Sequence, residues 1–63
     1  MNLLRLREVI ARTALSRSII YELMQRGEFP KPVKVYPGAR LNAWPADEID
    51  AFIASRIADR EAA

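Results

Sequence analysis

Four polar side chains recur at helical spacing in the segment 15–26 of the chain. They are Arg17, Ser18, Tyr21 and Gln25. Positions i, i+1, i+4 and i+8 lie on one side of a helix, so these side chains share a face. A guanidinium, two hydroxyls and an amide are groups that hydrogen-bond to DNA phosphates and to base edges. The spacing therefore predicts a helix with a DNA-contacting face.

Each of these four residues also has a plainer interpretation. Arg17 and Ser18 suit a solvated first helical turn, although an Arg there opposes the helix dipole, which favours the DNA contact. The ring of Tyr21 also suits packing against a neighbouring hairpin. Gln25 is equally suited to solvent exposure.

Three further cations follow in a proline-rich stretch. They are Lys31, Lys34 and Arg40. Arg40 has no carboxylate beside it in the sequence, and we expect it to contact phosphate or the minor groove. Lys31 and Lys34 are expected to contact phosphate, or alternatively to keep an exposed strand edge soluble. Arg5 and Arg7 stay open between a DNA contact and a solvated surface.

The two parts of the chain differ in charge. Residues 1–42 hold eight cations and three carboxylates, whereas residues 43–63 hold two cations and five carboxylates. The overall net charge is only +2. The asymmetry favours a polyanionic partner for the first part, with a chance distribution of surface charge as the alternative.

The composition argues against catalysis. The chain has no Cys and no His, which removes thiolate chemistry, disulfides and the commonest metal ligand and general base. The carboxylates Asp47, Glu48 and Asp50 stand where a helix should begin, so they are interpreted as partners of its dipole rather than as metal ligands. We expect no enzyme activity, no catalytic residue, no cofactor, no metal and no small-molecule ligand.

The length of 63 residues predicts one domain spanning 1–63. No apolar run is long enough to cross a membrane, and the first residues lack the apolar core of a signal peptide. We expect an intracellular, cytoplasmic protein.

Two short helices are predicted in the first half. An apolar stripe marks the first, over 6–13. Ser16 is a good N-cap for the second, Leu15 and Ile20 are spaced for a hydrophobic staple, and Gly27 suits the position after its end. The second helix should run from Arg17 to Arg26, and the pair forms a helix-turn-helix.

A hairpin and a third helix are predicted in the second half. Alternation indicates strands over 33–35 and 40–43 around a turn at 36–39. A lone hairpin is marginal in water, so Trp44 should anchor it, with Phe29 and Phe52 also in the core. Pro45 suits the first turn of the last helix. The predicted fold class is mainly α with a small β-hairpin, a winged helix-turn-helix in the order helix, helix, hairpin, helix.

This pattern resembles the AlpA-type prophage regulators, a branch of the MerR-like winged-helix group that also contains phage excisionases. The resemblance is carried by the strings "LLRLREV" (3–9), "LSRSIIYEL" (15–23), "GEFPKPVKV" (27–35), "GAR" (38–40), "AW" (43–44) and "EIDAFI" (48–53). Three residues depart from the family pattern: Ala14 replaces a usual turn glycine, Ile19 a usual Thr and Phe52 a common Trp.

The resemblance implies sequence-specific binding to double-stranded DNA, as a transcription regulator or, alternatively, as an architectural excisionase at an attachment site. The second helix would enter the major groove and the wing would contact the flanking backbone. A domain this small should bind tightly only in several copies, so a second partner is the protein itself, bound cooperatively on repeated sites. An alternative of another class is a protein-interaction module that uses the last helix.

Overall fold

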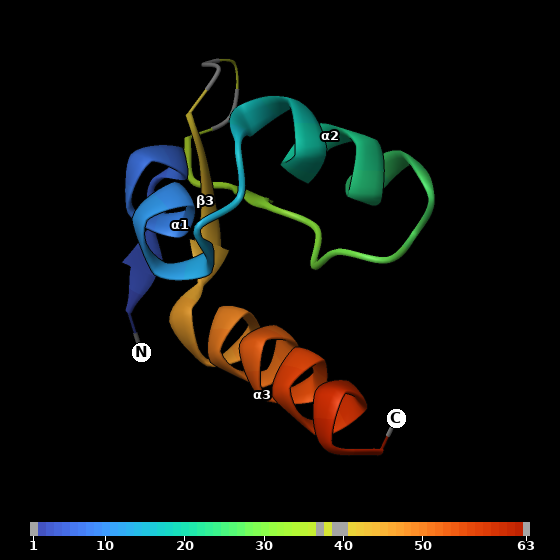
Figure 1. The fold of residues 1–63 in the computed structure, drawn as a ribbon. Coiled ribbons are helices and arrows are strands. Elements are labelled where there is room, and N and C mark those ends of the chain that lie inside the picture. Colours follow the sequence, from blue (N-terminus) through green and yellow to red (C-terminus); the bar gives the residue numbers. More distant parts are fainter. Residues whose placement is uncertain (1, 37, 39–40, 63) are drawn as a thin grey trace.

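The structure is a computed structural model that describes residues 2–36, 38 and 41–62. Its elements follow the order β1 (Leu3–Leu4), α1 (Leu6–Thr13), α2 (Arg17–Gln25), β2 (Val33–Lys34), β3 (Asn42–Pro45) and α3 (Ala46–Ala62). The predicted fold class is confirmed: the chain is mainly helical, with a helix-turn-helix followed by a small hairpin. Figure 1 shows α2 and the hairpin on one side of the molecule and α3 on the other.

The first helix begins and ends through local hydrogen bonds. The backbone N–H of Arg5, its N-cap, donates to Oε1 of Glu8 over 3.0 Å. At the other end, the Thr13 hydroxyl donates to the carbonyl of Val9 at 2.8 Å. Ala14 then adopts the left-handed conformation, with φ 61° and ψ 17°, which is the region that favours glycine. The helix therefore stops at the residue where the family resemblance expects a turn glycine.

The second helix is capped as the sequence predicts. The hydroxyl oxygen of Ser16 accepts a hydrogen bond from the backbone N–H of Ile19 at 3.3 Å. Gly27 has φ 73°, and the N–H of Glu28 reaches back to the carbonyl of Leu23 at 2.9 Å. This is the glycine-dependent Schellman arrangement. The helix proper ends at Gln25, one residue before the predicted end, and Arg26 is its C-cap.

The sheet has one more strand than predicted. Its order is β1-β3-β2, and both pairings are antiparallel. Leu4 pairs with Trp44 in the first and Lys34 with Asn42 in the second. The strand β1 was not predicted, because its two residues are too few to show an alternating pattern.

The predicted bounds of the hairpin need a correction. The second strand runs from Asn42 to Pro45 instead of 40–43, and Arg40 lies outside the described residues. Pro45 pairs with Leu3 in this strand rather than opening α3. A proline fits here because the next residue, Ala46, supplies the N–H that bonds to the carbonyl of Asn2 at 2.8 Å.

One cluster of buried side chains joins the helices to the sheet. It comprises Leu4, Val9, Ile20, Phe29, Trp44 and Ile49. The predicted core positions of Trp44 and Phe29 are confirmed, whereas Phe52 is only partly buried and packs edge-on against Phe29, with ring centroids 4.7 Å apart. The cluster fixes α1, α2 and β3 relative to one another, and these three elements carry the candidate site.

Candidate nucleic-acid interface

The outer face of α2 carries the four polar residues that the sequence singled out. Ile20 is fully buried, and Leu23 and Met24 pack against the same cluster. The opposite face is exposed to solvent and carries Arg17, Ser18, Tyr21 and Gln25, and Ile19 and Glu22 of the same helix are also exposed. The amphipathic pattern therefore predicted correctly which side of α2 faces outward.

A hollow lies between the start of α1, the outer face of α2 and β3, and we call it the α1–α2 hollow. Its volume is about 820 Å³. The polar side chains that line it are Arg5, Arg7, Glu8, Arg17, Tyr21 and Asn42. The fold thus brings Arg17 and Tyr21 together with two arginines that are distant in sequence. Ser18 and Gln25 are exposed on α2 but do not line this hollow.

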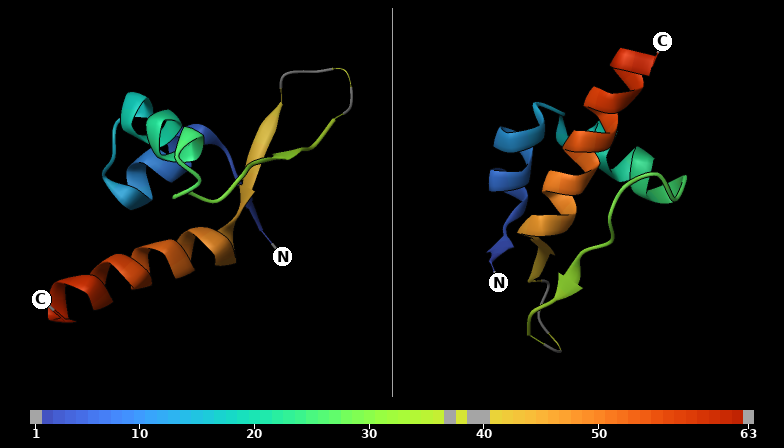
Figure 2. Two further views of the ribbon diagram at one scale, coloured as in Figure 1. Left: turned by 90° about the vertical axis from the view of Figure 1, so that its right-hand side faces the viewer. Right: turned by 90° about the horizontal axis from the view of Figure 1, so that it is seen from below.

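The predicted wing residues lie next to this site or beyond it. Lys34 is exposed on β2 and is paired with Asn42, which itself lines the α1–α2 hollow. Lys31 is exposed in the segment that connects α2 with β2. The left view of Figure 2 shows α2 and the hairpin on the side of the molecule opposite α3.

The described cations divide into two groups by their partners. Those in ion pairs are Arg12 with Asp50, Arg26 with Glu22 and Glu28, Arg56 with Asp59, and Arg60 with Glu61. Over residues 2–36, 38 and 41–62, those whose charged side-chain nitrogens have no carboxylate oxygen within 4.0 Å are Arg5, Arg7, Arg17, Lys31 and Lys34. Every described cation of the predicted DNA-binding set falls in the second group.

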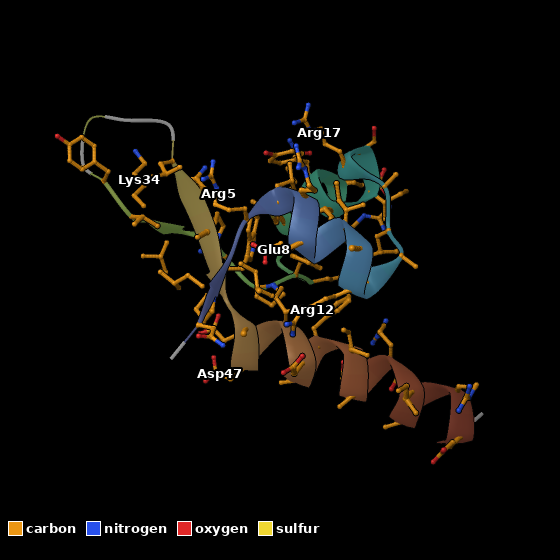
Figure 3. All side chains as sticks on the ribbon, turned by 90° about the vertical axis from the view of Figure 1, so that its left-hand side faces the viewer. Arg5, Glu8, Arg12, Arg17, Lys34 and Asp47 are labelled. Carbon is orange, nitrogen blue, oxygen red and sulfur yellow. The ribbon has the colours of Figure 1, made fainter. Side chains whose placement is uncertain are left out.

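The cations with and without ion-pair partners also differ in where they lie in the fold. In Figure 3, Lys34, Arg5 and Arg17 lie on the side away from α3, whereas Arg12 points toward α3 and Asp47 lies on it. Arg5, Arg17 and Lys34, which have no ion-pair partner among the described residues, thus lie on the side of α2 and the hairpin. Their charge favours a negatively charged ligand on that side.

Arg5 and Arg7 are the residues that sequence reasoning did not assign. The carboxylate of Glu8, three residues after Arg5, accepts the backbone N–H of Arg5 and forms no ion pair with its guanidinium among the described contacts. The available signal was the alternation in "LLRLREV", where Arg5 and Arg7 flank Leu6. Their proximity to Arg17 depends on the tertiary fold.

The acidic residues at the start of α3 have local partners. Oδ1 of Asp47 accepts the N–H of Glu48 at 3.1 Å, and Asp50 pairs with Arg12 at 3.3 Å. In the part of the chain that the structure describes, no three potential ligands come together as a metal site would require. No described helix has the length and apolar character needed to cross a membrane.

Comparisons with known proteins connect this arrangement to prophage regulation. The family model described as "Prophage CP4-57 regulatory protein (AlpA)" matches residues 2–57. An "Uncharacterized protein ORF88" of Enterobacteria phage P4 is 47% identical over 58 residues, or 92% of the chain. The chain spans 64% of the length of that relative. No solved structure matches the chain.

Proposed function

The chain belongs to the AlpA family of prophage regulatory proteins, and from this premise we propose that it regulates transcription by binding a specific double-stranded DNA sequence. Its family is one of regulatory proteins rather than enzymes. In this proposal residues 1–63 act as one winged helix-turn-helix domain. The observation that carries the proposal is that the polar face of α2 is exposed and that three unpaired cations, Arg5, Arg17 and Lys34, share the side of the molecule away from α3.

The second helix is the proposed base-reading element. It has nine residues, so it is about 14 Å long at 1.5 Å per residue. The major groove is about 12 Å wide and admits such a helix. Arg17 can donate two hydrogen bonds to a guanine, and Gln25 can form two with an adenine, by donating to N7 and accepting from the N6 amino group. Ser18 and Tyr21 supply hydroxyls for bases or phosphates on the same face.

The hairpin β2–β3 is the proposed wing. Lys31 and Lys34 would neutralise backbone phosphates beside the groove, and so would Arg40, which lies outside the described residues. Phosphate contacts fix the register of a protein on the duplex without reading its sequence. We assign α2 the discrimination between sequences and the wing a general contribution to affinity.

Tight binding should require more than one copy. The domain presents one short helix and one small wing, so the contact area of a single copy is limited. Several copies on repeated sites, by cooperative or dimeric binding, would convert weak contacts into tight occupancy. A sigmoidal titration on duplexes with two sites, and a hyperbolic one on duplexes with a single site, is the expected result.

Two other functions compete with this proposal. An excisionase would use the same contacts architecturally, at repeats in an attachment site. A protein-interaction module would use α3, where Ile57 is 46% exposed and borders a second hollow with Leu23 and Phe52. Footprinting around the chain's own gene and any adjacent integrase gene separates the regulator from the excisionase. Regulation predicts protection at a promoter, and excision predicts protection of repeats at an attachment site.

Salt dependence tests the shared premise of DNA binding. Lys31, Lys34, Arg40 and one or two residues of α2 would neutralise about four to five phosphates. The slope of log K against log salt concentration should therefore be about −4, at roughly −0.9 per phosphate. A slope near zero on duplex DNA would remove nucleic acid as the partner and favour the interaction module.

A further inference from the structure

We propose that the α1–α2 hollow binds a phosphate group of the DNA backbone, and that Arg5 and Arg7 hold it. The inference rests on the proposed function and adds the start of α1 as a third DNA-contacting element beside α2 and the wing. It assigns roles to two residues whose sequence context was compatible with plain solvent exposure.

The charge of the hollow suits an anion. Three guanidiniums line it, those of Arg5, Arg7 and Arg17, against the single carboxylate of Glu8. That carboxylate already accepts the backbone N–H of Arg5. Among the described residues, no carboxylate oxygen lies within 4.0 Å of the guanidinium nitrogens of these three arginines. Guanidinium donors match the oxygens of a phosphate in geometry as well as charge.

Buried neighbours fix the position of the two arginines. Leu4 is 3% exposed and pairs with Trp44 in the sheet, so the chain that leads into Arg5 is tied to β3. Leu6 packs against the core cluster, and the exposed Arg5 and Arg7 flank it. The backbone beneath both guanidiniums is therefore held in place before DNA arrives, which lowers the entropy cost of binding.

The other wall of the hollow determines what kind of phosphate fits. Arg17 and Tyr21 belong to the proposed base-reading face of α2 and line the same hollow. A DNA strand crossing here would present its backbone to Arg5 and Arg7 and its base edges to α2. Asn42 lines the hollow and is paired with Lys34, so the backbone path continues toward the wing. The chemistry points to a phosphodiester within a duplex.

The first experiment compares variants on a random-sequence duplex, because a phosphate contact requires no particular operator. The double variant Arg5→Ala/Arg7→Ala should weaken binding about tenfold and flatten the salt slope by about 0.9, the value for one phosphate. Both side chains are exposed, so the thermal melt should stay unchanged and report an intact fold. The hydrogen bond from Arg5 to the Glu8 carboxylate should persist in the variant, because its donor is the backbone N–H of residue 5 and not the side chain.

The matched control is Arg12→Ala. Arg12 lies on the same helix and carries the same charge, but it pairs with Asp50 of α3 at 3.3 Å and does not line the α1–α2 hollow. It should change duplex affinity by less than about twofold, as expected for loss of a distant, screened charge. Equal losses for Arg12→Ala and the double variant would show a general charge effect and overturn the site.

A second experiment locates the phosphate. Single methylphosphonates, which lack the phosphate charge, are placed in turn along a duplex that the protein selects from a random pool. At one position the neutral group should lower the affinity of the wild type for the duplex about tenfold. It should lower the affinity of the double variant less than about twofold, because the variant has already lost that contact. Equal losses for both proteins at every position would overturn the assignment.

The outcomes separate the inference from its premise. If the wild type shows no salt-dependent duplex binding, the proposed function fails. The phosphate held by Arg5 and Arg7 adds about 0.9 to the slope expected from the other contacts, so the wild-type slope should be about −5. If the wild type binds with a slope of about −4 and the double variant binds equally well, only the role of Arg5 and Arg7 fails.

Discussion

The indole N–H of Trp44 donates a hydrogen bond of 2.9 Å to the carbonyl oxygen of Pro30. Trp44 lies in β3, and Pro30 lies in the segment that connects α2 with β2. Trp44 is 1% exposed, and this bond gives the only polar group of its buried side chain a partner. The bond ties the hairpin to the exit of α2 and thereby orients the proposed wing relative to the proposed reading helix.

Trp44→Ala should abolish cooperative folding. Truncation of a buried aromatic costs about 3–5 kcal/mol, which matches the whole stability that a domain of this size typically has. Trp44→Phe keeps most of the apolar packing but removes the donor to Pro30, so it should fold with a loss of about 1–2 kcal/mol. Thermal melting of both variants checks that Trp44→Ala loses more stability than Trp44→Phe. A wild-type melting temperature for Trp44→Ala would contradict the anchoring role.

Ala14→Gly should stabilise the protein. Ala14 has φ 61°, and a Cβ in that region costs about 1 kcal/mol relative to glycine. The expected gain is about 0.5–1 kcal/mol, or a few degrees in Tm at about 4–8 °C per kcal/mol. The control is Ala11→Gly, at an exposed position inside α1, which should lose about 0.8–1 kcal/mol. A decrease in Tm for both variants would show that Ala14 is not strained.

The helices could be predicted because each carries its own local signals. The stripe of α2, its cap at Ser16 and its stop at Gly27 all lie within the segment 15–27, and the structure realises each of them. Period and capping depend on neighbours along the chain, so no tertiary information was needed. The same logic correctly separated the buried face of α2 from the exposed face that carries Arg17.

The remaining features depend on contacts between distant segments. Leu3 and Leu4 form β1 only because β3 offers them a strand to pair with. Leu3 pairs with Pro45 and Leu4 with Trp44, so the partners are distant in the sequence. Pro45 looked like the start of a helix, yet this pairing holds it in the sheet. The position of Arg5 and Arg7 beside Arg17 follows from the same pairing. The α1–α2 hollow was therefore out of reach of periodicity, spacing or composition.

Two neighbouring serines should separate stability from binding. Ser16 caps α2 by accepting the N–H of Ile19, so Ser16→Ala should cost about 1 kcal/mol of stability. Ser18 is exposed on the proposed DNA-contacting face, so Ser18→Ala should leave stability within about 0.5 kcal/mol. It should instead weaken DNA binding by roughly 1 kcal/mol, the size of one hydrogen bond. Melting curves and duplex titrations of both variants test this assignment. It would be contradicted if Ser18→Ala lowered the stability and Ser16→Ala lowered only the affinity for DNA.

Arg17 and Lys34 should affect DNA binding in different ways. Arg17→Ala removes a proposed base contact on α2, so it should cost about 1–3 kcal/mol on the selected duplex and reduce discrimination against a scrambled one. Lys34→Ala removes a proposed phosphate contact on β2, so it should weaken both duplexes by similar factors and flatten the salt slope by about one unit. Arg40, outside the described residues, should behave like Lys34.

The measurement is a titration of each variant on both duplexes at two salt concentrations. Arg60→Ala is the control, because Arg60 pairs with Glu61 near the end of α3 and should change neither affinity nor slope. If Arg17→Ala weakens both duplexes equally while Lys34→Ala or Arg40→Ala removes discrimination, then α2 contacts the backbone and the wing reads the DNA. A wing residue in a narrow, electronegative minor groove would produce that result, because groove width depends on sequence.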